Sequence, residues 1–249
     1  MRSLRSVLTF PGAVRLLRVG AIAALAACSA GSGRRSPASA THTATHTATH
    51  TTTNTDIRLD GRFDDWANVP VWTQAAQSGG PLQAAWATDD PQWWYLSFSV
   101  RDSVNHSSMA GTLHVLIDAD DNSTTGGTAF DNARGLTGAE LSLDLSRADK
   151  LQGTNIGAGA ALRTVHTTGL ATYRSAYDLG VVAQPSWSAT RFELRIARSG
   201  ALDGFGQLGR AIRARLVFES SSGAITSLPA ARYVFVTPHD ARANTDLAS

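Results

Sequence analysis

The chain is predicted to be all-β, and its folded part is predicted to be a single antiparallel β-sandwich of the jelly-roll or immunoglobulin-like kind. Apolar and polar residues alternate with a period of two in several stretches between 94 and 235, which is the pattern of strands with one buried face. Turns rich in Gly, Asp, Asn and Ser separate these stretches, and no long stretch shows the period of an amphipathic helix. We expect roughly nine or ten strands between residues 56 and 240.

The first 27 residues are predicted to form a secretory signal peptide. The apolar run 19–25 is shorter than the ~20 residues that a membrane-spanning helix needs. It ends in Leu25-Ala26-Ala27-Cys28, which resembles the lipobox of bacterial lipoproteins. This resemblance implies that Cys28 becomes the first residue and carries acyl chains such as palmitate, and that Ser29 directs the protein to the outer membrane of a cell that has one. The alternative is an ordinary signal peptide cleaved near Ala30.

Residues 28–55 are predicted to be a flexible tether, because Gly, Ser, Pro, Ala and Thr leave almost nothing to bury. His42, His46 and His50 recur in its Thr/Ala repeat. We interpret them as part of a spacer, and the alternative is an adventitious metal-binding tract. Residues 241–249 are expected to be a loose tail, so the predicted domain covers 56–240.

The overall charge is misleading about partners. The formal net charge is +2, but six of the 22 Lys and Arg residues lie before residue 36, where there is no Asp or Glu. The rest of the chain therefore has an excess of acids, which argues against a nucleic-acid partner. The single cysteine excludes an internal disulfide and a cysteine-based zinc site.

The strands of the domain follow from the alternation. The inward positions are predicted to be occupied by Trp94, Leu96, Phe98 and Val100; by Leu113, Val115 and Ile117; by Leu141, Leu143 and Leu145; by Phe192, Leu194 and Ile196; and by Leu216 and Phe218, with Tyr233 and Phe235 near the end. The residues between them, His114 among them, are expected to face water.

An acidic loop follows the predicted strand 112–117. Asp118, Asp120 and Asn122 alternate, and Asp121 adds a carboxylate. Hard oxygen ligands in a loop are the ligands that Ca²⁺ prefers, so a structural calcium site is one interpretation and a solvated turn is the other. The loop is not an EF-hand, because Ser123 and Ala129 stand where that motif needs Gly and Glu.

Aromatic residues are the candidates for a sugar-binding surface, because flat rings match the C–H faces of sugars. Trp66 and Trp94 are expected in the core. Trp72, Trp93, Tyr95 and Trp187 are the candidates for ligand binding, with a packing role as the alternative for each.

Catalytic motifs are missing from the sequence. Asp64-Asp65 and Asp89-Asp90 are adjacent pairs whose side chains diverge in a strand, so they cannot flank one glycosidic bond. There is no Gly-x-Ser-x-Gly elbow, no His-Glu-x-x-His and no phosphate-binding loop. We therefore expect that the protein is not an enzyme.

Several stretches together resemble the family 9 carbohydrate-binding modules and their DOMON-like relatives. The start Ile57-Arg58-Leu59-Asp60-Gly61-Arg62-Phe63-Asp64-Asp65-Trp66 resembles the opening "I-x-x-D-G-x-x-x-D-W" of that group. Further similar stretches follow in the same order at 84–96, 116–126, 138–140 and 191–197. The chain departs from the pattern at Ala197-Arg198, where many members carry Pro-Trp.

This resemblance implies a β-sandwich that holds sugars between aromatic side chains and often carries structural calcium. Some DOMON-like domains bind haem b through a Met and a His, here Met109 with His106, His114 or His166. The expected function is that of an extracytoplasmic, membrane-anchored lipoprotein that binds a glycan or cell-envelope polymer without cleaving it. The alternatives are a structural or protein-interaction module of the envelope, a glycan-active hydrolase, and a haem-binding domain.

Overall fold

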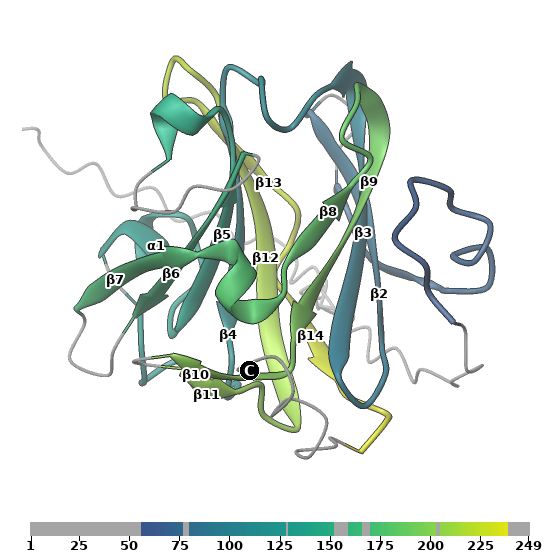
Figure 1. The fold of residues 1–249 in the computed structure, drawn as a ribbon. Helices are drawn as coiled ribbons and strands as arrows, with labels where there is room; N and C mark the ends of the chain where they lie inside the picture. The colour runs from purple at the N-terminus through teal and green to yellow at the C-terminus, as the bar shows by residue number, and fades with distance from the viewer. Residues whose placement is uncertain are drawn as a thin grey trace, which may run out of the picture. The chain divides into compact units, whose positions relative to one another are not determined.

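The computed structural model describes residues 56–76, 80–127, 129–151, 159–165, 170–202 and 205–238. Within these ranges the chain forms two antiparallel sheets that face each other across a hydrophobic core (Figure 1). The predicted β-sandwich is therefore confirmed. The predicted signal peptide, Cys28, the tether and the tail lie outside the described residues, and no helix within the described ranges is long and apolar enough to cross a membrane.

The first sheet has five strands in the order β1-β2-β3-β9-β8. The long strand β3 (Trp93–Val104) pairs with β2 (Leu82–Asp89) on one side and with β9 (Ala189–Ala197) on the other. The edges are the short strands β1 (Val71–Gln74) and β8 (Val182–Gln184). Short edge strands leave few backbone groups open to pairing with another chain.

The second sheet has seven strands in the order β13-β12-β4-β5-β6-β7, and β14 also pairs with β12. Its members are β4 (Thr112–Asp118), β5 (Leu141–Leu145), β6 (Ala160–Val165), β7 (Ala171–Ser175), β12 (Ala211–Glu219), β13 (Ile225–Ser227) and β14 (Ala231–Val234). The described residues also contain the ribbon of β10 (Ser199–Leu202) and β11 (Phe205–Gln207), helix α1 (Ala129–Ala133) and two 3₁₀ turns (Ala148–Lys150 and Ala176–Leu179). The strands that exceed the predicted number are short, and three or four residues are too few for an alternation to be visible.

The core lies between the inner faces of the two sheets. Trp94, Leu96 and Phe98 of β3 are buried in it, as the alternation predicted. Val115 and Ile117 of β4 belong to the same cluster and come from the opposite sheet. The period of two therefore identified the inward-facing positions of both central strands.

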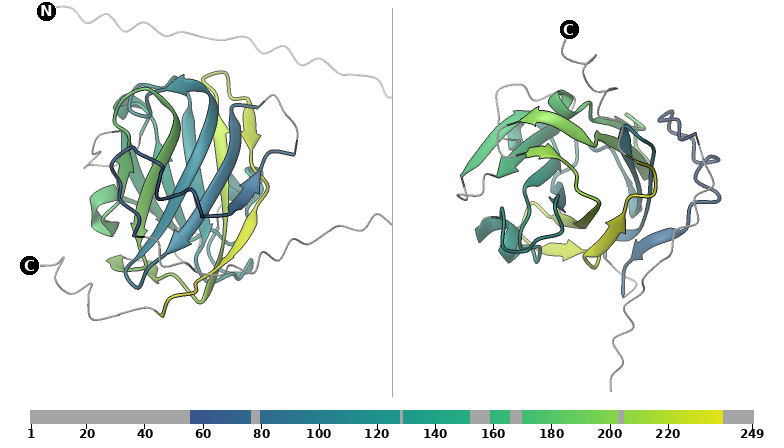
Figure 2. Two further views of the ribbon diagram at one scale, coloured as in Figure 1. Left: turned by 90° about the vertical axis from the view of Figure 1, so that its right-hand side faces the viewer. Right: turned by 90° about the horizontal axis from the view of Figure 1, so that it is seen from below.

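The outer face of the five-stranded sheet is covered by the first described residues. Residues 56–70 cross that face, which is turned toward the viewer in Figure 2, left. Glu193 of β9 is completely buried beneath them and accepts hydrogen bonds from Gly61 N–H at 2.7 Å and from Trp66 Nε1–H at 2.9 Å. The motif Asp60-Gly61…Asp65-Trp66 thus covers one face of the sandwich and is fixed there by hydrogen bonds to one buried carboxylate. Burial raises the pKa of Glu193.

The segment between β4 and β5 packs on the outer face of the second sheet. It contributes to a small apolar cluster made of Leu116, Leu136, Ala139 and Val217. Asp131 of α1 forms a buried ion pair with Arg163 of β6. His114 is buried as well, with Nδ1 at 2.8 Å from Asp144 Oδ1. The expectation that His114 faces water is therefore wrong, because this segment covers strand positions that would otherwise be exposed.

Candidate functional site

The predicted ligand-binding residue Trp72 lies in the core. It is on β1, not in a loop, and its side chain is buried. The ring meets Trp94 edge-on with ring centroids 5.9 Å apart, and Nε1 donates to the carbonyl oxygen of Arg232 at 3.0 Å. The ring and the polar edge of Trp72 are therefore occupied by the protein itself.

Trp93 and Tyr95 lie on the outer face of β3, as expected from their register, and both are buried there. The Arg195 guanidinium lies 4.1 Å from the centre of the Trp93 ring. The Tyr95 hydroxyl donates to Asp90 Oδ2 at 2.7 Å, and burial together with this carboxylate raises the pKa of Tyr95. Neither ring presents an open face to a ligand.

Trp187 is different, because 56% of it is exposed. One side of the indole packs against the covering segment: a Cβ built on Gly61 would lie 3.0 Å from Trp187 Cη2, and Gly61 has a φ of +78°. Glycine is the residue that tolerates both this close approach and this backbone conformation. The four predicted aromatic residues are therefore not brought together as one exposed surface, and of the four only Trp187 has an accessible ring.

The acidic loop contains a potential cation site. Ligand oxygens of Asp118, Asp120 and Glu140 all lie within 4.8 Å of one another. Asp118 and Asp120 were predicted, whereas Glu140 comes from the start of the next hairpin and was quoted in the resemblance without a role. The other two predicted ligands point elsewhere: Asp121 pairs with Arg232, and Asn122 Oδ1 accepts hydrogen bonds from Thr124.

Glu140 is buried, and only one of its two carboxylate oxygens has a hydrogen-bond partner among the described residues. Its Oε2 accepts a hydrogen bond from Ala119 N–H at 2.7 Å, while its buried Oε1 has no hydrogen-bond partner among the described residues. Burial, with the charges of Asp120 and Asp118 nearby, raises the pKa of Glu140 to about 7. Three carboxylates, one with a buried oxygen that accepts no hydrogen bond from the described residues, fit a divalent cation such as Ca²⁺. One of them, Asp118, also accepts a hydrogen bond from Arg213 Nη2 at 2.7 Å.

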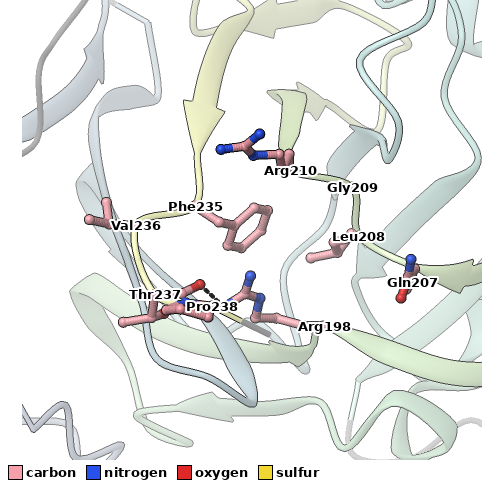
Figure 3. Close-up of a pocket in the computed structure, with 9 residues that line it drawn as sticks. All are labelled: Arg198, Gln207, Leu208, Gly209, Arg210, Phe235, Val236, Thr237 and Pro238. Carbon is pink, nitrogen blue, oxygen red and sulfur yellow. Dashed lines mark hydrogen bonds between the residues drawn. The ribbon is translucent and has the colours of Figure 1, made fainter. Parts of the chain in front are cut away.

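A pocket of about 370 Å³ opens at one end of the sandwich (Figure 3). Three segments form it: Arg198 between β9 and β10, residues 207–210 from the end of β11 to the start of β12, and residues 235–238 after β14. In the view of Figure 3, the ring of Phe235 lies between the side chains of Arg198 and Arg210. The Arg198 guanidinium stacks on that ring at 4.2 Å from its centre.

Hydrogen bonds fix the floor of this pocket, which we call the end pocket. Asp89 is buried at the end of β2 and accepts hydrogen bonds from the Tyr233 hydroxyl at 2.6 Å and from Thr237 N–H at 3.0 Å. Arg198 donates to the carbonyl oxygens of Asp90 at 2.8 Å and Thr237 at 2.9 Å. These bonds fix the guanidinium beneath Phe235 without filling the pocket.

The end pocket was not predicted from the sequence. Its residues come from three parts of the chain that are brought together only by sheet pairing. The sequence identified Ala197-Arg198 only as a departure from the pattern of the family that the chain resembles, and it predicted no role for Arg198.

A second, apolar cavity of about 200 Å³ lies between the sheets, and His106 and Met109 are both in its wall. His106 is buried rather than solvated, and its ring meets Phe192 edge-on. An engineered cavity of about 150 Å³ holds one benzene molecule. A haem macrocycle, with four pyrrole rings, is larger than this space. His166, another considered partner, lies outside the described residues.

Comparisons with known proteins find a likeness in fold alone. No protein-family model and no curated protein sequence matches the chain. One similar solved structure is a family 9 carbohydrate-binding module from Caldicellulosiruptor kristjanssonii in complex with cellotriose, with 12% identity, a TM-score of 0.40, and coverage of 76% of this chain and 92% of that one. Another is a family 9 module from the same organism in complex with glucose, with 13% identity, a TM-score of 0.36, and coverage of 70% and 81%. The function of those modules is not carried over at this distance, and the case for a function rests on this chain's own residues.

Proposed function

We propose that the protein is an extracytoplasmic, lipid-anchored binding module that holds a glycan in the end pocket without cleaving it. The observation that supports this is the lining of the pocket. One aromatic ring, Phe235, stands among the hydrogen-bonding side chains of Arg198, Gln207 and Arg210. A volume of about 370 Å³ is within the usual range of small-ligand sites.

The chemistry of a sugar matches this lining. A pyranose ring has a face of C–H groups, which packs on an aromatic ring, and a rim of hydroxyls, which needs donors and acceptors. The face of Phe235 that Arg198 does not cover supplies the apolar surface, and Gln207 supplies an amide with both donors and an acceptor. Arg198 is already fixed by Asp90 and Thr237, so little conformational entropy is lost when it contacts a ligand.

Anchoring through Cys28 is the second part of the proposal. The tether 28–55 would let the sandwich reach away from the membrane surface, and the lipid would keep it near envelope polymers. A glycan partner and a membrane partner are therefore compatible, with an outer-membrane location where the cell has one.

A structural divalent cation is a further candidate function, supported by the buried Oε1 of Glu140. Calcium bound by Asp118, Asp120 and Glu140 would neutralise carboxylates that burial disfavours. Ala119 links the candidate cation site to the end pocket. Its N–H donates to Glu140 Oε2 at 2.7 Å, and its carbonyl oxygen accepts a hydrogen bond from the N–H of Gly209, in the pocket wall, at 2.7 Å. The cation would therefore stiffen one side of the pocket.

The test is a glycan array followed by titration of any hit, with the full chain in detergent. Phe235→Leu removes the aromatic face but retains an apolar side chain, and we expect it to weaken binding about tenfold. Trp187→Leu is the matched control at the exposed tryptophan, and we expect it to bind as the wild type does. If only Trp187→Leu weakens binding, the site is at Trp187 and not in the pocket. Binding to no saccharide, or release of shorter products from the bound glycan, would contradict the proposed function.

A further inference from the structure

The end pocket has more positive charge than its own carboxylate can balance. Two arginines line it, Arg198 and Arg210. Within the described part of the chain, the carboxylate paired with them is Asp89, at 3.4 Å from Arg198. Arg210 is exposed at the rim and forms no ion pair with a described carboxylate.

Asp89 is not available to Arg210. Its Oδ1 accepts from the Tyr233 hydroxyl and from Val236 N–H, and its Oδ2 accepts from Thr237 and Arg198. A carboxylate with this many donors around it is fully engaged beneath the pocket floor. The charge of Arg210 therefore has no counterpart among the described carboxylates.

Arg198 retains unused hydrogen-bonding capacity. It is buried, and the hydrogen bonds found for its guanidinium use one terminal nitrogen, Nη1. Its Nε is buried without a hydrogen-bond partner among the described residues. Nη2 takes part in none of these hydrogen bonds, and because Arg198 lines the pocket, Nη2 is the donor that remains for an acceptor on a ligand.

Carboxylates lie on the other side of Gly209, and two arginines offset part of their charge. A Cβ on Gly209 would lie 3.4 Å from Asp120 Cα, so the acidic loop adjoins this wall. Asp118 pairs with Arg213, and Asp121 pairs with both Arg213 and Arg232. Asp120 and Glu140 have no ion pair with a described arginine, and their carboxylates converge with Asp118 on the candidate cation site and not on Arg210.

We propose that the end pocket selects sugars that carry an anionic group, a carboxylate or a phosphate. The sugar ring packs on Phe235, and Arg210 and Arg198 receive the anion, since guanidinium groups form strong charge-assisted hydrogen bonds with both. This inference rests on the proposed glycan-binding function and adds the class of sugar.

The test compares pairs of probes that differ in charge, with the full chain in detergent and isothermal titration calorimetry. Trigalacturonate is compared with its methyl ester, and glucose 6-phosphate with glucose. We expect the charged member of at least one pair to bind about tenfold more tightly, and added NaCl to reduce that difference. The pair that shows the difference identifies carboxylate or phosphate as the recognised group.

Arg210→Gln tests whether the selection occurs in the pocket. Because Arg210 is exposed, the variant should keep the wild-type melting temperature. We expect its affinity for the charged probe to fall about tenfold more than its affinity for the neutral one. Arg101→Gln, which removes an exposed arginine on β3 outside the pocket lining, is the matched control and should change neither.

The outcomes separate the two proposals. Equal affinity for charged and neutral probes overturns the anionic selection while glycan binding stands. A charge preference of unchanged size in Arg210→Gln shows that Arg210 does not receive the anion, and it also overturns the proposed anionic selection. Binding of no saccharide, charged or neutral, overturns both.

Discussion

Replacing Glu140 with glutamine should stabilise the protein at pH 8 in the absence of calcium and remove its response to calcium. Glu140 is only 7% exposed, and its Oε1 has no hydrogen-bond partner among the described residues. Burial raises its pKa from 4.5 to about 7. The glutamine side chain would retain an acceptor for Ala119 N–H and would place an amide, without negative charge, beside Asp118 and Asp120.

The magnitude follows from the pKa. A carboxyl group whose pKa is higher in the folded state stabilises the fold while it is protonated. That contribution is complete below pH 4.5 and is lost as the pH rises through about 7. At about 1.4 kcal/mol per pH unit, the loss is about 3 kcal/mol. For a domain of this size that corresponds to about 6–12 °C in melting temperature.

The assay is urea unfolding followed by tryptophan fluorescence, at pH 5 and pH 8, with EDTA or with CaCl₂. In EDTA the wild type should lose stability between the two pH values, and Glu140→Gln should lose less. Calcium should restore the wild type at pH 8, because a ligand that binds only the folded state stabilises it. Glu193→Gln is the control, since Glu193 is also buried but lies on the other sheet with both oxygens bonded, and it should keep the calcium response.

Two results would refute this reasoning. If Glu140→Gln is less stable than the wild type at pH 8 in EDTA, ionised Glu140 does not destabilise the folded state. If the variant keeps the full calcium response, or the wild type has none, Asp118, Asp120 and Glu140 do not bind the ion.

The remaining predictions concern the covering segment and the anchor. Trp66→Phe leaves Glu193 Oε2 without its indole donor and should cost about 1–3 kcal/mol, measured by urea unfolding; an unchanged stability would show that the carboxylate finds another donor. Gly61→Ala places a Cβ 3.0 Å from Trp187 at a φ of +78° and should lower the melting temperature by several degrees in calorimetry, since the left-handed conformation costs about 1–2 kcal/mol. Cys28→Ala should abolish incorporation of radiolabelled palmitate and release the protein from the membrane fraction; retained label would place the lipid elsewhere.

Part of the candidate cation site was predictable because its residues are local. Asp118 is the last residue of the buried strand β4 and Asp120 comes two residues later, so their common direction could be inferred from strand geometry. Glu140 could not be inferred in the same way. It joins them because β4 and β5 pair as neighbours, which places its carboxylate against the Ala119 N–H.

For the aromatic candidates, the sequence predicted the side of the strand but not whether the side chain is exposed. Register correctly placed Trp93 and Tyr95 on the outer face of their strand, yet both are buried there. Burial on an outer face depends on what crosses it, and strand periodicity contains no information about that. Trp187 has an accessible ring because it lies in the connection between β8 and β9.

The sequence by itself determined the strands, the inward positions of Trp94, Leu96 and Phe98, and hence the sandwich, because a period of two is a local property of extended backbone. Only the tertiary structure decided which polar faces are covered and where a pocket opens. The bond from Trp66 to Glu193 and the stacking of Arg198 on Phe235 join residues that are far apart in the chain. Such contacts exist only after the strands have paired, so the end pocket is a product of topology rather than of any motif.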